Sequence, residues 1–176
     1  MDSKIRLVPL FTSQQISARI DELASEIGRD YRDSCPLLLG VLKGSFVFLA
    51  DLARRLDFPV ELDFIRVASY GSKLESSGRV KLLSEPVARV KDRHVLMVED
   101  IVDTGLTTDF IGGWLKSKGP ASVKLCALLD KPDRRLRPVE VDYRGFVIPD
   151  RFVVGYGLDM DEKYRNLPGI SVINGE

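Results

Sequence analysis

The stretch Val95–Thr108 reads VLMVEDIVDTGLTT and combines an apolar run, three acids and a threonine-glycine turn. The four apolar residues at its start are typical of a buried strand, and residues 107–118 have helical character. A helix that follows a strand presents unpaired backbone N–H groups, which bind phosphate. The stretch therefore predicts a phosphate site with carboxylates beside it, at the end of a strand.

Apolar strands and amphipathic helices alternate on both sides of this stretch. We predict helices over residues 13–31, 46–56 and 107–118, and strands over 37–42, 60–67, 95–98, 121–129, 146–148 and 152–154. The alternation indicates an α/β fold, a parallel sheet with helices on both faces. Loops 42–45, 99–108 and 130–133 each follow a strand, so they should share the rim where such sheets bind ligands. Residues 68–80, rich in Ser and Gly, are expected to form a long mobile loop.

Composition narrows the class of protein. The 176 residues favour one domain, and 26 basic residues balance 26 acidic ones. Zero net charge argues against a large surface for nucleic acid or for an anionic membrane. No apolar run approaches a membrane span of about 18 residues, and the start MDSKIRLVPLF lacks the apolar region of a signal peptide. We therefore expect a cytoplasmic protein, with Cys35 and Cys126 as buried reduced thiols and His94 as a solvated residue entering a strand.

The chemistry of the opening stretch divides along its length. Gly105 allows close approach of the backbone to a ligand, and threonines 104, 107 and 108 add hydroxyl donors. Glu99 and Asp100 offer only acceptors, which suit sugar hydroxyls or a magnesium ion. Asp103 lies between the two parts. A phosphorylated sugar with a reacting centre fits this order, whereas the simplest alternative is a solvated acidic turn that caps a helix.

Two other phosphate-binding motifs are absent from the sequence. The stretch GVLKGS does not have the spacing of a Walker A loop. Gly155-Tyr156-Gly157 lacks the third glycine and the following helix of a dinucleotide-binding fingerprint.

The opening stretch resembles the phosphoribosyl diphosphate (PRPP) motif of type I phosphoribosyltransferases. Other segments are similar to the hypoxanthine-guanine phosphoribosyltransferase family, in the family's order: LLLGVLKGSFVFLADLAR, ASYG, LLDKPDRR and IPDRFVVGYGLDMDEKYRNLP. The resemblance implies one domain over residues 1–176, with a type I phosphoribosyltransferase core at about 36–130 and a small hood from about 1–12 and 131–176. It also implies purine salvage: transfer of the 5-phosphoribosyl group from PRPP to hypoxanthine or guanine, giving IMP or GMP plus pyrophosphate. Relatives are usually homodimers or homotetramers.

The resemblance also implies roles for residues that meet the purine. Asp103 would be the catalytic acid, taking the proton from the purine ring nitrogen and facing the positive charge that develops on the ribose. Lys131 would donate to the six-oxo group, and Phe152 would stack on the base. Val153 would contact the base through its backbone, and Asp159 would help to hold it. Without the resemblance, Lys131 would be an ordinary exposed lysine, Phe152 a core residue and Asp159 a loop cap.

The remaining implied contacts concern PRPP and magnesium. Lys43 and Gly44 match the family's pyrophosphate loop, in which the Leu42–Lys43 peptide can be cis, and Arg165 would also bind pyrophosphate. Ser69 and Tyr70 would belong to a lid that excludes water. The implied PRPP-binding residues are Glu99, Asp100, Ile101, Val102, Asp103, Thr104, Gly105, Leu106 and Thr107. The cofactor would be Mg²⁺, which neutralises a diphosphate leaving group, with Glu99, Asp100 and Asp159 as its protein ligands.

Two alternatives stay open at this point. A xanthine-preferring enzyme would have the same motifs, whereas Lys131 and Phe152 argue against adenine as the base. A different class is an RNA-binding regulator that retains the PRPP motif, as pyrimidine attenuation proteins do. It would need a basic face, for which Arg134, Arg135 and Arg137 form a small cluster. A solvated or subunit-facing turn explains that cluster equally well.

Overall fold

The large sheet of the computed structural model, which describes residues 6–72 and 75–174, has the order β4-β3-β2-β5-β6-β7. β2 pairs in parallel with β3 and β5, and β6 pairs in parallel with β5 and β7. The carboxyl ends of these strands therefore meet at one rim, as the sequence predicts. The strands are β2 (Leu37–Leu42), β3 (Glu61–Ser72), β4 (Glu75–Ser84), β5 (His94–Val102), β6 (Ser122–Asp130) and β7 (Tyr143–Val147).

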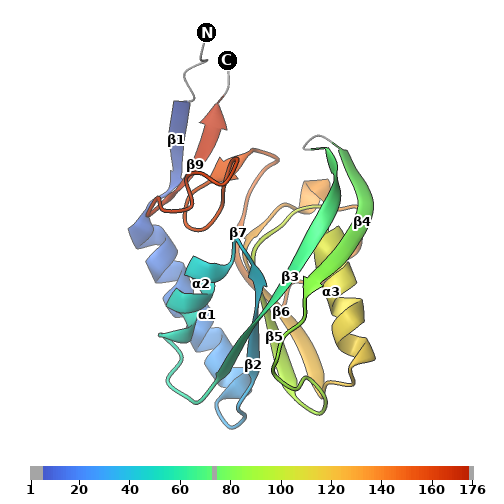
Figure 1. The fold of residues 1–176 in the computed structure, drawn as a ribbon. Coiled ribbons are helices and arrows are strands. Elements are labelled where there is room, and N and C mark those ends of the chain that lie inside the picture. The colour runs from blue at the N-terminus through green and yellow to red at the C-terminus, as the bar shows by residue number, and fades with distance from the viewer. Residues whose placement is uncertain (1–5, 73–74, 175–176) are drawn as a thin grey trace.

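Helices cover both faces of this sheet. α1 (Ser13–Tyr31) and α2 (Phe46–Ala53) lie on one face and α3 (Leu106–Ser117) on the other (Figure 1). α1 begins with a capping box between Thr12 and Gln15, and its predicted apolar stripe is buried in the core. Each fully buried Ile or Leu of such a stripe contributes about 1.5–3 kcal/mol, which fixes α1 on the sheet.

A second, antiparallel sheet brings the two ends of the chain together. β1 (Arg6–Phe11) pairs with β9 (Ile170–Asn174), which pairs with β8 (Val153–Val154). In Figure 1 this small sheet lies above the large sheet, on the side of α1 and α2. Between β6 and β8 the chain forms a short 3-10 turn, Pro132–Arg134, and then β7 of the large sheet.

Two predictions about local structure were wrong. β5 does not end at Val98 but continues through Val102, paired with β6, so Glu99 and Asp100 are strand residues, whereas Asp103 follows the strand. Residues 68–80 are not a loop: residues 68–72 belong to β3 and residues 75–80 to β4, in an antiparallel hairpin. The reason is that ladder hydrogen bonds use backbone groups, which a Ser- and Gly-rich composition does not remove.

The thiols and the histidine were predicted with mixed success. Cys126 is buried in the core, but Cys35 is exposed, because it precedes β2 instead of lying within it. His94 is exposed at the first position of β5, as expected, with its Nδ1 2.8 Å from the Ser122 hydroxyl. No helix in the described part of the chain is long and apolar enough to cross a membrane.

Candidate active site

A cavity of about 230 Å³ opens at the carboxyl rim of the large sheet. It lies between the ends of β2 and β5 and the start of α3, and it unites two groups of residues that the sequence assigned to PRPP. Its lining residues are Val41, Leu42, Lys43, Gly44, Val67, Glu99, Asp100, Ile101 and Thr107. The structure therefore places the predicted pyrophosphate loop beside the predicted ribose acids.

Burial disfavours the ionised form of the two acids at the end of β5, Glu99 and Asp100. Burial raises the pKa of Glu99 well above its usual range, and the neighbouring Asp100 carboxylate raises it further. Burial also raises the pKa of Asp100 to about 6, against the lowering effect of nearby backbone N–H groups and of Arg165. Adjacent buried acids that resist ionisation are typical of a site that receives a cation or donor hydroxyls.

The start of α3 has the backbone geometry expected of a phosphate cradle. Gly105 precedes the helix with φ +82°, a conformation that side chains other than glycine rarely adopt. The N–H of Leu106 approaches the Thr104 hydroxyl at 3.5 Å, and Thr107 lines the cavity. Thr108, however, is buried and faces away, into a cavity on the flank of α3. Of the three threonines, Thr107 thus lines the rim cavity and Thr108 does not.

Asp103 has an arginine as its close neighbour. Its Oδ1 lies 3.1 Å from Nε of Arg134, whose NH1 is also 3.3 Å from Oδ1 of Asp150. Oδ1 of Asp103 is buried and accepts no well-aligned hydrogen bond, so the contact is an ion pair without directional bonding. The predicted catalytic acid therefore has acceptor capacity left for another donor.

The loop after β2 is compressed against β5. The Leu42–Lys43 peptide is cis. A Cβ at Gly44 would overlap the Asp100 carboxylate, so only glycine fits there without displacing that acid. Nζ of Lys43 forms an ion pair with Glu162 at 3.0 Å.

A loop from the C-terminal segment closes over the loop after β2. NH1 of Arg165 donates to the carbonyl of Gly157 at 2.7 Å, and its NH2 lies 2.9 Å from Oδ1 of Asp159. A Cβ at Gly157 would overlap the carbonyl oxygen of Gly44, so the two loops touch. Arg165 also has a buried Nε without a hydrogen-bond partner. Lys43, Gly44 and Arg165 therefore meet at one corner of the site, where Glu162 contacts both basic side chains.

The residues assigned to the purine lie at two strand ends. Lys131 directly follows β6, Phe152 directly precedes β8, and Val153 is the first residue of β8. Lys131 is only 6% exposed, although a lysine after a strand is ordinarily solvated, and its backbone N–H donates to Val102 at 2.9 Å. Its Nζ lies 4.0 Å from Asp150. Phe152 is 56% exposed, outside the strand predicted for it, whereas Val153 is buried in β8. A buried lysine and an exposed phenylalanine reverse the ordinary structural expectation for both residues.

The predicted lid residues lie in the β3–β4 hairpin. Ser69 pairs with Val80, and Tyr70 with Arg79. Their side chains fall outside the described part of the structure. The hairpin extends on the side of the rim opposite the small sheet (Figure 1), and Val67 of β3 lines the cavity.

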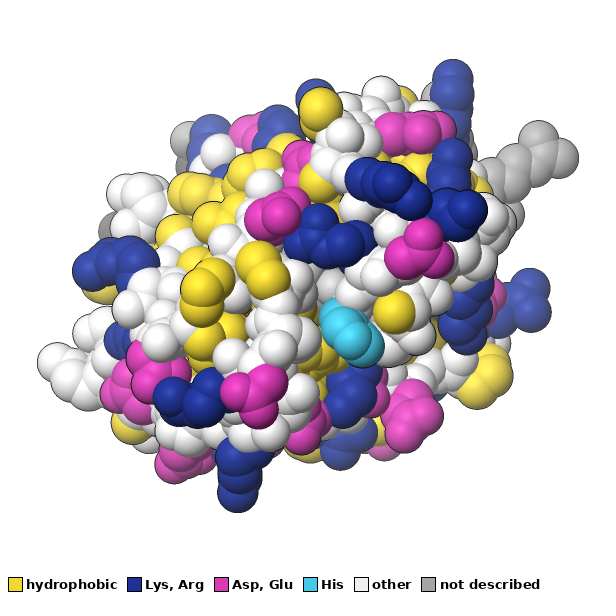
Figure 2. Space-filling view, turned by 90° about the horizontal axis from the view of Figure 1, so that it is seen from below, with side chains coloured by type: hydrophobic (Ala, Val, Ile, Leu, Met, Phe, Trp, Pro, Cys, Tyr) yellow, Lys and Arg dark blue, Asp and Glu magenta, His cyan; other side chains and the backbone are white. Residues whose placement is uncertain are grey.

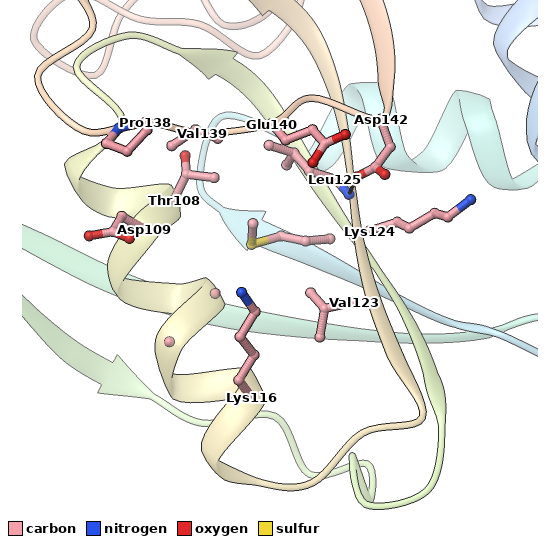
Figure 3. Close-up of a pocket in the computed structure, with 13 residues that line it drawn as sticks. Thr108, Asp109, Lys116, Val123, Lys124, Leu125, Pro138, Val139, Glu140 and Asp142 are labelled. Atoms are coloured by element: carbon pink, nitrogen blue, oxygen red, sulfur yellow. Dashed lines mark hydrogen bonds between the residues drawn. The ribbon is translucent and has the colours of Figure 1, made fainter.

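A second cavity, of about 280 Å³, lies on the flank of α3. In Figure 3, α3 with Lys116 forms one wall and β6 with Val123 another, and Glu140 and Asp142 lie near the opposite end. It adjoins the amino-terminal half of β6, not the carboxyl rim. Of the residues that the sequence assigned to phosphate, sugar or purine, only Thr108 lines it. The pyrophosphate loop and the ribose acids line the smaller rim cavity, which is therefore the candidate site.

The rim residues can be tested for their fit to magnesium. Glu99 and Asp100 are buried acids whose ionisation is disfavoured, and a divalent cation would offset that cost. Asp159 fits less directly, because Arg165 holds one of its oxygens and the Glu162 N–H donates to the other at 2.8 Å. Within residues 6–72 and 75–174, no three metal-binding side chains gather. The pair formed by Glu99 and Asp100 suits Mg²⁺, which takes one or two carboxylates plus substrate oxygens.

Sequence reasoning missed two sets of residues. Arg134 and Asp150 contact Asp103 and Lys131, and Arg135 forms a buried ion pair with Asp130. The arginines had been interpreted as a solvated turn or a basic face. The available signal was their position directly after Lys131, on a rim loop next to the PRPP motif.

The fold and this site define a phosphoribosyltransferase. The family model for the phosphoribosyl transferase domain matches residues 10–161. The chain is 43% identical to hypoxanthine-guanine phosphoribosyltransferase of Bacillus subtilis, over 93% of this chain and 91% of that protein. A crystal structure of a hypoxanthine-guanine phosphoribosyltransferase from Bacillus anthracis superposes with a TM-score of 0.92 at 43% identity, covering 97% of this chain and 100% of that one. A Trypanosoma cruzi hypoxanthine phosphoribosyl transferase, studied for the role of its C-terminal region in oligomeric state and activity, superposes with a TM-score of 0.90 at 42% identity, covering 99% and 94%.

With identity at this level over nearly the whole length, the chain belongs to the hypoxanthine-guanine phosphoribosyltransferase family.

Proposed function

We propose that this protein is a purine salvage enzyme that transfers the 5-phosphoribosyl group from PRPP to hypoxanthine or guanine, giving IMP or GMP plus pyrophosphate. The observation that carries this proposal is the buried Lys131 on the same rim as the PRPP cavity. Such a lysine has a reason to be buried if it donates to the six-oxo group of a purine. Family membership supports the same activity.

In this reaction Asp103 would accept the proton of the purine ring nitrogen that attacks the ribose. Its carboxylate would also stabilise the positive charge on the ribose ring as pyrophosphate leaves. Its contact with Arg134 leaves Oδ1 able to accept a hydrogen bond. Arg134 would shift toward Asp150 as the purine takes its place near Asp103.

The phosphate and the ribose of PRPP would contact different parts of the motif. The backbone of residues 104–107 would hold the 5′-phosphate, with the hydroxyls of Thr104 and Thr107. Glu99 and Asp100 would bind the ribose hydroxyls, while Ile101 and Val102 shape the end of β5. Pyrophosphate would lie against Lys43, Gly44 and Arg165. Ser69 and Tyr70 would help to close the site against water, and Leu106 completes the first turn of α3.

The purine would stack on Phe152, which is exposed and therefore available, and contact the backbone of Val153. A donor at Lys131 opposes the amino group of adenine, so adenine would be a poor substrate. Asp159 would hold the base through its loop, which Arg165 fixes.

We propose Mg²⁺ as the cofactor, held by Glu99 and Asp100 together with PRPP oxygens. It would neutralise charge on the leaving pyrophosphate. Asp159 could join as a ligand by exchanging its contact with Arg165. The residues themselves orient the ribose and exclude water around the reacting carbon.

Three broader features belong to the same proposal. The chain would form one functional domain, with the small sheet and the segment after Lys131, apart from β7 of the large sheet, as a hood over the core. It would act as a homodimer or homotetramer, for which exposed apolar side chains such as Phe46, Leu62 and Phe64 provide surface. It would work in the cytoplasm, where two unpaired cysteines are ordinary. Light scattering after size exclusion would test the assembly, and a purely monomeric result would refute it.

The alternatives are less well supported. In the RNA-binding reading the arginine cluster must be free, but Arg134 and Arg135 are engaged by Asp103 and Asp130. On the face shown in Figure 2, basic and acidic side chains are interspersed, so that face is not uniformly basic. A preference for xanthine would depend on contacts at the purine 2-position.

A spectrophotometric assay with PRPP and Mg²⁺ tests the proposal by comparing hypoxanthine, guanine, xanthine, adenine and uracil. We expect conversion of hypoxanthine and guanine and little conversion of adenine or uracil. Xanthine conversion faster than both would favour the xanthine alternative. Failure to convert any six-oxopurine would refute the proposed function.

A further inference from the structure

The segment after β6 is bonded directly to the PRPP loop. The backbone N–H groups of Leu136 and Arg137 both donate to the carbonyl of Thr104, at 2.8 and 3.1 Å. NH1 of Arg135 donates to the carbonyl of Asp103, at 2.8 Å. Three consecutive residues of one rim loop therefore hold two consecutive carbonyls of the other.

The bonds from residues 135–137 to the carbonyls of Asp103 and Thr104 form a clamp, and this clamp ends at a buried carboxylate. Asp130, the last residue of β6, is 1% exposed. Its Oδ1 accepts a hydrogen bond from NH2 of Arg135, and its Oδ2 lies 2.8 Å from Nε of Arg144 on β7. Arg135 and Arg144 thus engage one carboxylate oxygen each. Only Arg135 continues to the PRPP loop, because the other arm of its fork donates to Asp103.

There is little free space between the two loops. A Cβ at Gly105 would lie 2.8 Å from the carbonyl oxygen of Arg137 and 3.1 Å from Cδ of Arg135. The segment 135–137 therefore packs close against the left-handed glycine that starts α3, where a larger residue would not fit. The phosphate cradle and the backbone of the catalytic acid share one support.

We propose that Asp130 and Arg135 are positioning residues that fix the PRPP loop for the transfer reaction, an inference that rests on the proposed function. Asp130 directly precedes Lys131, the proposed purine donor, whose N–H is bonded to Val102. One buried ion pair thereby sets the spacing between the purine contact and the acid that receives its proton. A displacement of about 1 Å in such a constellation costs up to roughly 100-fold in rate.

Arg135→Gln and Arg135→Lys test this role, and Arg144→Gln is the matched control. Glutamine removes the charge, and lysine keeps the charge but not the fork that reaches both Asp130 and Asp103. Arg144→Gln removes an ion pair to the same carboxylate while leaving the bond from Arg135 to Asp103 in place. Asp130→Asn provides a second way to release Arg135 if the other variants fold poorly. Thermal melts establish which variants are folded.

We expect both Arg135 variants to lower kcat/KM for PRPP by about 10- to 100-fold, with kcat also reduced. The reason is that the PRPP loop contains both the proposed 5′-phosphate site and Asp103. Arg144→Gln should stay within about threefold of the wild type. Equal losses in Arg135→Gln and Arg144→Gln would show that the ion pairs give general stability only, and would overturn the proposal. Wild-type kinetics in folded Arg135 variants would overturn it as well.

Amide hydrogen exchange at Leu136 and Arg137 supplies a readout that does not depend on turnover. The exchange of both amides, corrected for intrinsic rates, should accelerate in Arg135→Gln and remain unchanged in Arg144→Gln. Unchanged exchange in Arg135→Gln would refute the clamp. If the wild type itself converts no six-oxopurine, the proposed function fails, and the exchange comparison alone then decides whether the clamp exists.

Discussion

Replacing Asp100 with asparagine should stabilise the protein at neutral pH and weaken its use of PRPP. In the folded protein, burial raises the pKa of this carboxyl from 3.8 to about 6. Asparagine has nearly the same shape and carries no charge, so it removes the cost of burying an ionised group. The same change removes a proposed ligand for the ribose and for magnesium.

The sign and size of the effect follow from proton linkage. Between pH 3.8 and about 6 the folded state retains a proton that the unfolded state has lost. Stability of the wild type therefore falls as pH rises through this window and stays lower above it. A rise from 3.8 to about 6 corresponds to about 3 kcal/mol at pH 8. Roughly half of this difference should develop between pH 5 and pH 8.

Urea denaturation of the wild type and Asp100→Asn at pH 5, 6, 7 and 8, without Mg²⁺ or PRPP, measures the difference. We expect the asparagine variant to gain stability relative to the wild type as pH rises, with a midpoint higher by about 1–2 M urea at pH 8. Asp33→Asn, at an exposed position, is the matched control and should show no such trend. A variant that is less stable than the wild type at pH 8, or a difference independent of pH, would refute the reasoning.

Four further changes probe the rest of the site. Asp103→Asn should lower kcat by about 100-fold or more with little change in melting temperature, and retained turnover in a pure sample would remove its proposed role. Lys131→Gln should raise KM for hypoxanthine and reduce the preference over adenine, as competing-substrate assays would show; an unchanged preference would contradict the hydrogen bond to the six-oxo group. Phe152→Ala should cost about 1–3 kcal/mol of purine binding in calorimetry while leaving stability nearly unchanged, since the ring is largely exposed. Gly44→Ala should displace the Asp100 carboxylate and raise KM for PRPP in steady-state assays, and wild-type kinetics would mean that the loop relaxes without cost.

Much of the fold was predictable because it depends on local apolar patterns. The stripe of Ile16, Ile20, Leu23 and Ile27 predicted α1, and the apolar runs before Lys43 and Glu99 predicted strands of a parallel sheet. Those features place the predicted PRPP residues at one rim without further information.

The failures share a physical cause: they depend on backbone pairing, burial and side-chain contacts that a local apolar pattern does not encode. The hairpin of residues 68–80 forms through backbone hydrogen bonds to which its composition gives no clue. β1 and β9 pair across nearly the whole chain and were not predicted. Asp130 and Arg135 were passed over because nothing local shows that the carboxylate is buried or that the guanidinium reaches Asp103.

The β3–β4 hairpin has a consequence for how the proposed lid would close. A mobile loop must order each residue on closing, at a cost of roughly 1–2 kcal/mol per residue in backbone entropy. Paired strands are already ordered, so they can swing as one arm and bend only where the pairing is irregular. The register shifts between Arg66 and Val67 and between Tyr70 and Gly71 provide such hinge points. Closure by an arm would leave more of the binding energy of PRPP available for catalysis than closure by a loop of equal length.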